Sequence, residues 1–500
     1  MISRQMVSGQ GVSGQALGAL LLALLALDNL LLPAYLGLSP FVVALAVVVF
    51  GAAIGWLALR PFAGAVQVPL RVIGISFVVA LGVFVLGGQG RLLFANADWQ
   101  VRDAVLADMA GHPWPFAYML NGAAVFLRAP LGMYLLPALA GRGHEWALLL
   151  SNAVRLALLL SLGWQLFDTN AKRWFALAGF LLFSGWDAVG MLFMGWLGAH
   201  QTWDHIETWS LGYQYSSHVT QAFWVPNHAL AGWTCALTYE LWRRGKAPIG
   251  LFAAAVPLTA IWSPLALMGA MPFVAVAGVI TLARRAFTRA DVALAGLALV
   301  LALPCLWFMS IDAGSVHKGV SWPVGVVIYI AIIAFEVLPF VVPPLLSRGS
   351  DGTQRLTLWV ALLCLMLMPC YQVGSSVDFQ MRSSIMPLAI VALAFVGWVA
   401  RLFDQRSVWS RAALAYGLVA LAIGAVTPAM ELHRTLVMRP TPGPRCSLVG
   451  VWMRQTIRVA PTATYVARVS ALPVAMRAMP VVAGVHEPAQ CWDRDWMVRR

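Results

Sequence analysis

Long apolar stretches separated by short polar segments make up most of this chain. Several approach the roughly 20 apolar residues that a helix needs to cross a bilayer. The pattern predicts an all-α integral membrane protein with about 13 spanning helices. The predicted spans lie at about 16 to 36, 41 to 59, 72 to 89, 146 to 166, 174 to 197, 226 to 242, 248 to 263, 265 to 283, 290 to 309, 323 to 346, 357 to 374, 383 to 400 and 412 to 430.

The composition agrees with this class of protein. Apolar residues account for 61% of the 500 residues and charged residues for 11%, and the mean hydropathy is +0.79. Such a chain cannot cover itself with polar surface in water. The net charge of +13 does not indicate a nucleic-acid partner, because the basic residues are scattered in twos and threes between apolar blocks.

The distribution of basic residues predicts the orientation. Residues 118 to 140 are a possible fourteenth span, and the positive-inside rule favours leaving them on the outer surface. The cytoplasmic segments then carry sixteen basic residues: Arg4, Arg60, Arg71, Lys172, Arg173, Arg243, Arg244, Lys246, Arg284, Arg285, Arg289, Arg348, Arg355, Arg401, Arg406 and Arg411. The outer loops before the tail hold Arg91, Arg102, Arg128, Arg142, Lys318 and Arg382. We therefore predict a cytoplasmic N-terminus and an outer C-terminus.

Two regions follow from this topology. Residues 1 to 430 form the transmembrane domain, with large outer loops at 90 to 145 and 198 to 225. Residues 431 to 500 turn polar and arginine-rich, and we predict a small α/β-like extracytoplasmic cap there. Cys446 and Cys491 are alone in this tail, so an oxidising compartment makes a disulfide between them plausible, with two free thiols as the alternative.

The first outer loop contains an acid at the predicted start of a helix. Asp98 and Trp99 precede RDAVLADM, whose apolar residues have helical spacing. One interpretation makes Asp98 an N-cap that accepts from free backbone N–H groups. The other makes it a general base, kept ionised by the helix dipole and by Arg102 four residues on. Asp103 is the second candidate catalytic acid.

Residues 95 to 165 resemble membrane glycosyltransferases of the GT-C type, the relatives of protein O-mannosyltransferases and lipid A aminoarabinose transferases. Similar features are Asp98-Trp99, the helix RDAVLADMAGHPW, Arg128-Ala129-Pro130-Leu131 followed by MYLLPALAG, and Arg155-Leu156. Trp99 stands where that family has the second acid of a pair. The resemblance implies surface helices lying flat in the first outer loop, a polyprenyl-phosphate sugar donor and no cofactor.

Further candidates lie in the span 174 to 197 and the second outer loop. Asp187 lies within apolar sequence, where an ionised group usually faces a cavity or a partner. The alternatives to a functional role are a helix-packing hydrogen bond and a pair with Arg155. The second loop mixes aromatic residues with polar ones, which suits sugar binding, although Asp204 to Glu207 also fits a capping box. A metal site is a further alternative. Its candidate ligands are His200 with Asp204, or His205 with Glu207 and His228. The same five residues are our substrate-binding candidates, together with Trp99, Arg102, Asp187 and Asp378.

Later outer segments offer positive charge for a lipid phosphate. Lys318 lies in the loop 310 to 322, and Asp378 and Arg382 are four residues apart at the outer start of a span. A guanidinium offers paired donors to a phosphate and stays charged. The alternative for Arg382 is a surface salt bridge with Asp378.

Together these features predict a glycosyltransferase of the bacterial inner membrane. Asp98 would accept a proton from an acceptor hydroxyl on the outer side, while Arg382, helped by Arg128 or Lys318, would stabilise the departing polyprenyl phosphate. We expect no metal and find no glycine-rich nucleotide loop. The alternatives are an O-antigen polymerase or ligase, a transporter or flippase, and a non-catalytic assembly protein. The oligomeric state does not follow from the sequence.

Overall fold

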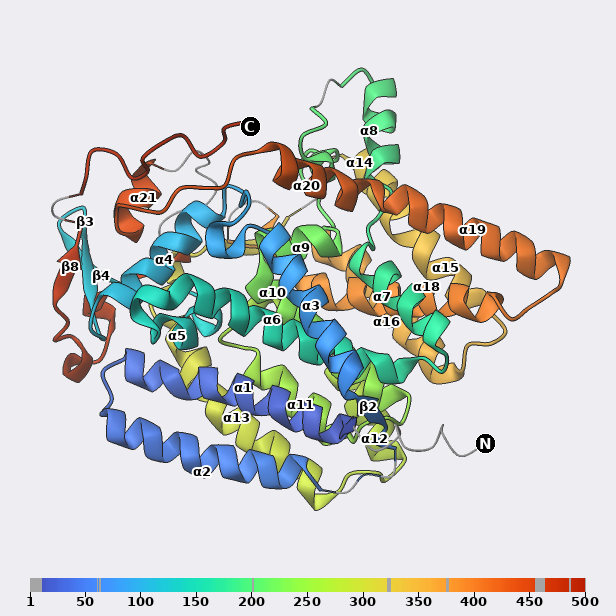
Figure 1. Cartoon of the computed structure of the whole chain (residues 1–500), viewed down its shortest axis with the longest axis horizontal. Coiled ribbons are helices and arrows are strands. Elements are labelled where there is room, and N and C mark those ends of the chain that lie inside the picture. The colour runs from blue at the N-terminus through green and yellow to red at the C-terminus, as the bar shows by residue number, and fades with distance from the viewer. Residues whose placement is uncertain are drawn as a thin grey trace.

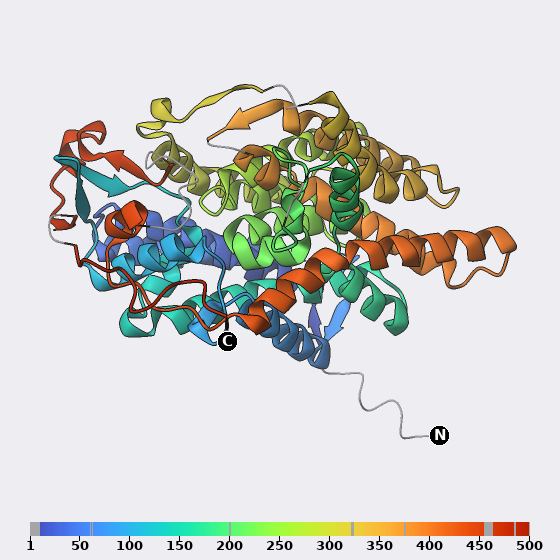
Figure 2. The same cartoon turned by 90° about the horizontal axis from the view of Figure 1, so that it is seen from above.

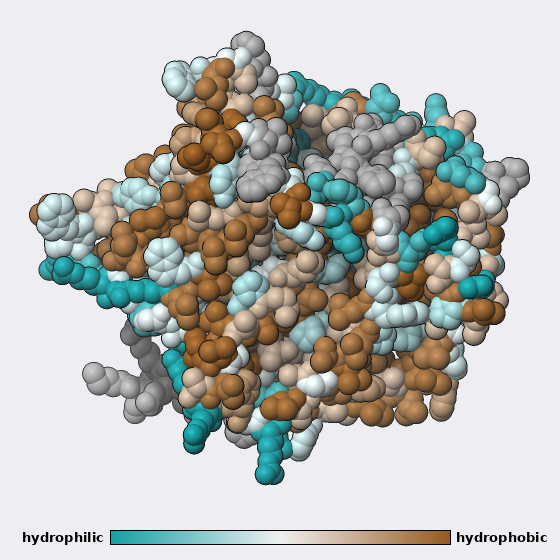
Figure 3. All heavy atoms as spheres, turned by 180° about the vertical axis from the view of Figure 1, so that it is seen from behind, coloured by the Kyte–Doolittle hydropathy of each residue, from teal (hydrophilic) through white to brown (hydrophobic). Residues whose placement is uncertain are grey.

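The computed structural model describes residues 11–499 except 61, 63, 200–201, 322–324, 375–376, 455–463 and 485–486. It is mostly helical, with the helices packed into one bundle and a small sheet at one end (Figure 1). Apolar side chains cover much of the face seen in Figure 3, with polar ones mainly towards its margins. Such a surface suits contact with lipid rather than water. The predicted class, a helical membrane protein, is confirmed.

Nine helical segments in the described part of the chain are long and apolar enough to cross a membrane. All nine coincide with predicted spans. They are Gly14–Tyr35 (α1), Pro40–Ala58 (α2), Gly141–Leu166 (containing α6, His144–Gly163), Pro264–Ala283 (α12), Arg289–Ser310 (α13), Val326–Leu346 (α14, Val326–Ile332, and α15, Leu338–Leu346), Gly352–Cys370 (containing α16, Gly352–Leu367), Ile385–Leu402 (α18) and Val408–Val437 (α19, Val408–Gly424, and α20, Val426–Val437).

The other four predicted spans take different forms. α3 (Leu70–Leu86) and α11 (Ile249–Leu258) are apolar but shorter, and α10 (Pro226–Arg243) is less apolar. The predicted span 174 to 197 is two helices, α7 (Asn170–Leu181) and α8 (Asp187–Trp196), and α8 projects from the bundle (Figure 1). The count of 13 and the orientation stay predictions.

Contacts with a π-helical segment explain the break between α7 and α8. The backbone N–H of Trp186 donates to the carbonyl of Phe335 (3.2 Å), which lies in the π-helix Ile333–Val337 between α14 and α15. A Cβ at Gly185 would lie 2.8 Å from the Cβ of Glu336. The prediction of one continuous helix was wrong because these tertiary contacts replace the helical hydrogen bonds there.

α10 and α18 form the centre of the bundle. Nearly every residue of both helices is buried, and they pack closely because Gly232 of α10 leaves room for Ile385, which a Cβ would approach to 2.4 Å. Small residues allow such close helix contacts in membranes. α10 thereby carries its polar N-terminal residues, Asn227 and His228, into the interior near one end of the bundle.

The first outer loop and the tail share a four-stranded sheet. β3 (Ala117–Leu120) and β4 (Ala123–Leu127) form a hairpin, β7 (Val466–Arg468) pairs antiparallel with β4, and β8 (Val481–Ala483) pairs parallel with β3. Figure 2 shows this sheet at one end of the molecule. The stretch 118 to 140 is therefore strands and a short helix, α5 (Gly132–Ala138), rather than a spanning helix.

The helix predicted in the first outer loop is present but is not a surface helix. α4 (Trp99–Gly111) buries ten of its 13 residues because the tail covers it. Asp108 of α4 accepts hydrogen bonds from the backbone N–H of Leu448 (2.7 Å), at the start of α21 (Leu448–Arg454), and from the Tyr118 hydroxyl (2.9 Å). The tail is closed by a disulfide between Cys446 and Cys491.

The remaining elements are short. The segments predicted to lie on the outer side also contain α9 (His218–Trp224), α17 (Asp378–Ser383) and a strand pair formed by β5 (Lys318–Val320) and β6 (Tyr371–Val373). A further pair joins β1 (Gly11–Ser13) to β2 (Gln67–Pro69). Short 3-10 helices include Gln89–Arg91, Gly141–Gly143, Trp164–Leu166, Ile206–Thr208, Ala313–Ser315, Met368–Cys370, Val469–Ala471 and Val474–Met476.

Candidate functional site

The start of α4 is fixed by contacts with α9. The side chains of Asn96 and Trp99 both donate to the carbonyl of Phe223 (2.9 and 2.7 Å), and the N–H of Asp98 donates to the Asn96 side chain (3.1 Å). Trp99 is buried and performs this anchoring role. The contacts hold Asp98 at the first turn of the helix.

The carboxylate of Asp98 is not an N-cap. It makes no capping hydrogen bond to the backbone of α4, so that interpretation was wrong. Instead it lies 3.6 Å from a guanidinium nitrogen of Arg102, and its side chain is 37% exposed whereas that of Arg102 is 3% exposed. Asp98 is therefore a paired but accessible carboxylate, open to a proton donor from outside the protein.

Arg102 is held rigidly from the other side. Its Nη1 donates to the side chain of Asn227 at the start of α10 (3.1 Å), and the Tyr134 hydroxyl is a further hydrogen-bond partner. Asn227 in turn donates to the carbonyl of Trp262 (3.1 Å). These contacts fix the Arg102 guanidinium, and none of them comes from a buried carboxylate.

Arg382 approaches the same place from α17. It is ion-paired with Asp378, as the surface-pair alternative proposed, but the pair is largely buried, with side-chain exposures of 15% and 19%. Arg382 and Arg102 both act electrostatically on His228, whose Nδ1 is hydrogen-bonded to the Ser263 hydroxyl (2.7 Å). His228 therefore lies close to two guanidinium groups.

Tyr465 of the tail connects these groups. Burial raises the pKa of its hydroxyl, and the next influences on that pKa are Arg102, Asp98, Arg382 and Asp378, the two arginines opposing the rise. All four side chains therefore lie within electrostatic range of one hydroxyl. We refer to Asp98, Arg102, His228, Asp378, Arg382 and Tyr465 as the outer cluster. It combines an accessible carboxylate with two guanidinium groups.

Other predicted residues of the first outer region lie elsewhere. Asp103 points towards Arg91 (3.7 Å), which also binds Glu145 (2.8 Å), and burial raises the pKa of Asp103 to about 7. The Arg128 guanidinium is directed towards the carbonyl of Met309 (3.4 Å). Lys318 is exposed on β5.

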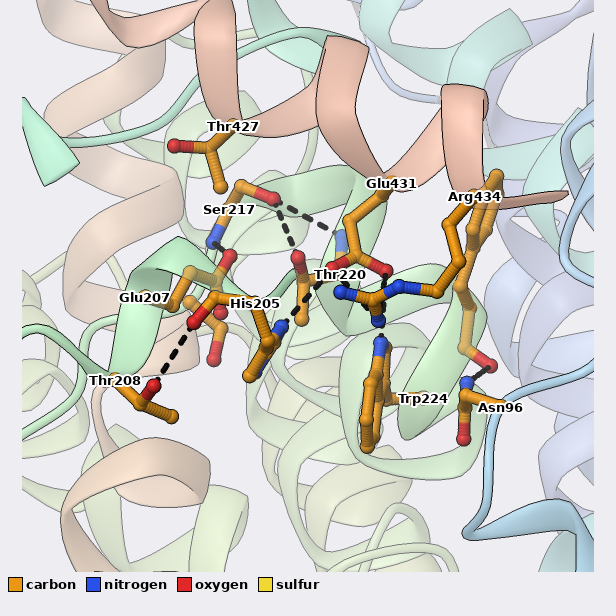
Figure 4. Close-up of polar contacts among 12 residues, drawn as sticks. Asn96, His205, Glu207, Thr208, Ser217, Thr220, Trp224, Thr427, Glu431 and Arg434 are labelled. Carbon is orange, nitrogen blue, oxygen red and sulfur yellow. Dashed lines mark hydrogen bonds and ion pairs between the residues drawn. The ribbon is translucent and has the colours of Figure 1, made fainter. Parts of the chain in front are cut away.

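The second outer loop forms a separate polar network, shown in Figure 4. His205 binds Glu431 of α20 (3.0 Å) and stacks on Trp224, with ring centroids 4.8 Å apart. Trp224 donates to the other oxygen of Glu431 (3.0 Å), and Arg434 lies 3.3 Å from Glu431. This network fastens the last long helical segment to the loop.

Glu207 is buried beside this network. It accepts from the backbone N–H of Ser217 (2.8 Å) and the side chain of Gln214 (2.9 Å). The predicted capping box was wrong, because these partners come from the chain that follows, and Asp204 is exposed. Burial raises the pKa of Glu207 to about 7, and the nearby His205 opposes the rise. For His205, burial lowers the pKa, but the bond to Glu431 gives a net rise.

Asp187 is buried at the first turn of α8. Asp187 accepts hydrogen bonds from the hydroxyls of Ser184 (2.9 Å) and Thr427 (2.7 Å). It also lies against the side chain of Glu336 in the π-helix. The indole of Trp209 donates to Glu336 (2.6 Å). The possible pairing of Asp187 with Arg155 was wrong. Arg155 binds the buried carboxylate of Asp28 instead (2.7 Å).

The important residues missed by sequence reasoning are Tyr465, Asn227 and Glu431. Asn227 was detectable as the neighbour of His228 in the polar sequence VPNH. Glu336 lies inside a predicted span but ranked below Asp187 because it belongs to no motif, and Glu431 lies one residue beyond the predicted span 412 to 430. Tyr465 carried no local signal, since its role depends on the return of the tail to the first outer loop.

Within the part of the chain that the structure describes, no three His, Cys, Asp or Glu side chains are placed to hold a metal ion. His205, Glu207 and His228 therefore do not form the alternative metal site, and His200 lies outside the described residues. The protein is an integral membrane protein with a polar cluster at one end of its helical bundle. No protein-family model, curated protein or solved structure matches the chain.

Proposed function

We propose that this chain is a membrane glycosyltransferase that uses a polyprenyl-phosphate sugar donor. The acceptor would be a glycan, lipid or protein of the cell envelope. The observation that carries the proposal is that Asp98, Arg102 and Arg382, from α4 and α17, all lie within electrostatic range of the Tyr465 hydroxyl, and both arginines within range of His228. An accessible base and two fixed cations are the groups that transfer from a lipid phosphate requires. The resemblance of residues 95 to 165 to the GT-C type points to the same chemistry.

The proposed reaction is a single displacement with inversion. The acceptor hydroxyl gives its proton to Asp98 while its oxygen forms a bond to the anomeric carbon of the sugar. The bond between that carbon and the phosphate oxygen breaks, and its electron pair leaves with polyprenyl phosphate. Arg382 and Arg102 stabilise the departing charge, because guanidinium groups bind phosphate through paired hydrogen bonds. The substrate phosphate thereby loosens the pairs that these arginines form with Asp378 and Asp98.

The proposal places the outer cluster on the extracytoplasmic side of a bacterial inner membrane. The excess of basic residues in the opposite loops supports this orientation, and so does the disulfide between Cys446 and Cys491, a bond typical of oxidising compartments. We retain 13 spans with an inner N-terminus and an outer C-terminus. No cofactor is required, since the lipid-linked sugar supplies the leaving group.

A transfer assay tests the proposal. Purified protein in liposomes receives radiolabelled polyprenyl-phosphate sugar and cell-envelope acceptors. We expect Asp98→Asn to lower transfer by about 100-fold or more, the usual contribution of a general base, and Arg382→Ala to impair it strongly. Asp204→Asn is the matched control, because Asp204 is an exposed acid of the other outer loop. Full transfer by Asp98→Asn protein would exclude this carboxylate as the base.

A transporter or flippase is the second candidate. The observation that favours it is the interruption between α7 and α8 beside the π-helix, where the buried carboxyls of Asp187 and Glu336 meet. Interrupted helices with buried ionisable groups are typical of transporters, and π-segments are frequent at functional sites. In the same liposomes, movement of the lipid-linked sugar to the other leaflet without its consumption would favour this candidate.

A further inference from the structure

A groove on the side of the bundle lies apart from the outer cluster. Residues of α3 and α7 form its walls, and residues of α6 and α10 form its floor. Both wall helices lie on the viewer's side of Figure 1. The groove encloses about 730 Å³ of space not filled by protein atoms, counting its open side. Among the described residues that line it, Arg173 is the only charged one.

The length of the groove matches one leaflet of a bilayer. Its lining follows α6 from Leu156 to Gly163 and continues to Trp164 at the start of the 3-10 helix, and eight residues of helix rise by about 12 Å. Half of a hydrocarbon core of about 30 Å is about 15 Å. The lining along this distance includes Leu159, Leu160 and Leu237, which offer contacts to hydrocarbon. A single acyl chain of one leaflet therefore fits the groove in both length and polarity.

One end of the groove has the chemistry of a lipid headgroup boundary. The Nε of Arg173 donates to the carbonyls of Trp164 (3.2 Å) and Phe167 (2.9 Å), and its guanidinium lies 4.4 Å from the centre of the Trp164 ring. Trp174 packs edge-on against Trp164, with centroids 5.7 Å apart. Tryptophan and arginine are the side chains that commonly anchor a protein at this level of a membrane.

Arg173 is the basic group at this end best placed to bind an added anion. The neighbouring Lys172 is ion-paired with Asp404 (2.6 Å) and with Asp168 (3.4 Å). Arg244, which lies over the Phe167 ring, is paired with Glu240 (3.0 Å). The hydrogen bonds of Arg173 are instead with two carbonyls and the side chain of Asn170. The nearest acid that acts on it, Asp168, is paired with Lys172, so Arg173 has no carboxylate of its own among the described residues. Charge therefore favours an acidic headgroup over a zwitterionic one.

We propose that this groove binds an anionic phospholipid, with one acyl chain between α3 and α7 and the phosphate at Arg173. The lipid comes from the leaflet that contains the turn between α6 and α7. The acyl chain fills the space between α3 and α7, which bulk lipid would otherwise occupy. The site shares no residue with the outer cluster, so the proposal does not depend on glycosyl transfer.

Native mass spectrometry of the purified protein tests the headgroup contact. The detergent-washed protein is incubated with phosphatidylglycerol or phosphatidylcholine at equal concentrations. We expect one retained phosphatidylglycerol and about fivefold weaker binding in Arg173→Gln, the effect of one basic side chain at an anionic surface. Arg60→Gln is the matched control, because Arg60 also lies over a tryptophan, Trp56 (4.3 Å), but does not line the groove.

A second variant tests the groove itself. Gly163 lies on its floor, and a Cβ there would meet its nearest neighbour, Leu237, at 3.8 Å. The Cβ of Gly163→Leu therefore fits without a clash, the rest of its side chain enters the groove, and we expect this variant to retain neither lipid. Gly55→Leu on α2 is the control, since a Cβ there meets nothing within 4 Å. Equal retention of both lipids by the wild type, or unchanged phosphatidylglycerol binding in Gly163→Leu, would overturn the proposal.

Discussion

A buried ion pair beneath the outer cluster allows a sharp test of the interior electrostatics. The carboxylate of Asp28 is fully buried and accepts two hydrogen bonds from Nη2 of Arg155 (2.7 and 2.8 Å) and one from the Trp262 indole (2.8 Å). The guanidinium also lies 4.9 Å from the centre of the Trp262 ring. Trp262 accepts from Asn227, which holds Arg102, so the pair supports the floor of the site.

Asp28→Leu removes the negative charge and leaves the buried guanidinium uncompensated. We expect a loss of about 3–5 kcal/mol in the free energy of unfolding, the usual cost of removing one partner from a buried pair. Arg155→Met alone should cost a similar amount. The double variant Asp28→Leu with Arg155→Met should cost far less, about 1–3 kcal/mol, since no buried charge is left unpaired and only the Trp262 N–H and the Ser151 hydroxyl then lose a partner.

The assay is equilibrium unfolding of the detergent-solubilised protein, followed by tryptophan fluorescence for the wild type, both single variants and the double variant. The expected coupling energy between the two positions is several kcal/mol. Single-variant losses below about 1 kcal/mol together with additive effects would show that Asp28 and Arg155 are not a charged pair. The structural support proposed for Arg102 would then be wrong as well.

Two further predictions concern the junction between α4 and the tail. Burial raises the pKa of Asp108 to about 6 from 3.8, so the folded state binds more protons than the unfolded state between these values and stability falls as the pH rises through that window. Both hydrogen bonds that Asp108 accepts end on one oxygen, which Asn can supply. Asp108→Asn should therefore gain up to about 3 kcal/mol over the wild type between pH 4 and 7, measured as thermal stability against pH, and a difference independent of pH would contradict this. Cys446→Ser opens a loop with a sequence separation of 45 and should destabilise the tail by about 4 kcal/mol on chain-entropy grounds. Faster proteolysis of the tail would reveal this, and a wild-type tail fragment whose gel mobility does not change on reduction would refute the disulfide.

The long helices were predictable because length and apolarity are sufficient signals for them. The division of 174 to 197 into α7 and α8 was not, since it depends on the contact of Trp186 with Phe335 and on the room that Gly185 leaves for Glu336. The cap sheet was equally hidden. Its strands are three to five residues long, too short for a clear alternating pattern, and two of the three pairings join positions more than 300 residues apart.

Much of the outer cluster was predictable from local signals. Asp98 and Arg102 are four residues apart on one helix, and so are Asp378 and Arg382, which places each pair on one face. The same geometry explains why Asp103 lies apart, because five residues of helix turn its side chain to a different face. Tyr465 could not be predicted, since only pairing of β7 with β4 brings it there.

The central claim is that the outer cluster binds the phosphate of a lipid-linked sugar. The most direct measurement is a cryo-electron microscopy structure of the Asp98→Asn protein with a polyprenyl-phosphate sugar bound. We predict phosphate density within about 3 Å of the guanidinium groups of Arg382 and Arg102, with the anomeric carbon of the sugar facing residue 98. Phosphate density elsewhere, with the pair between Arg382 and Asp378 intact, would contradict the claim.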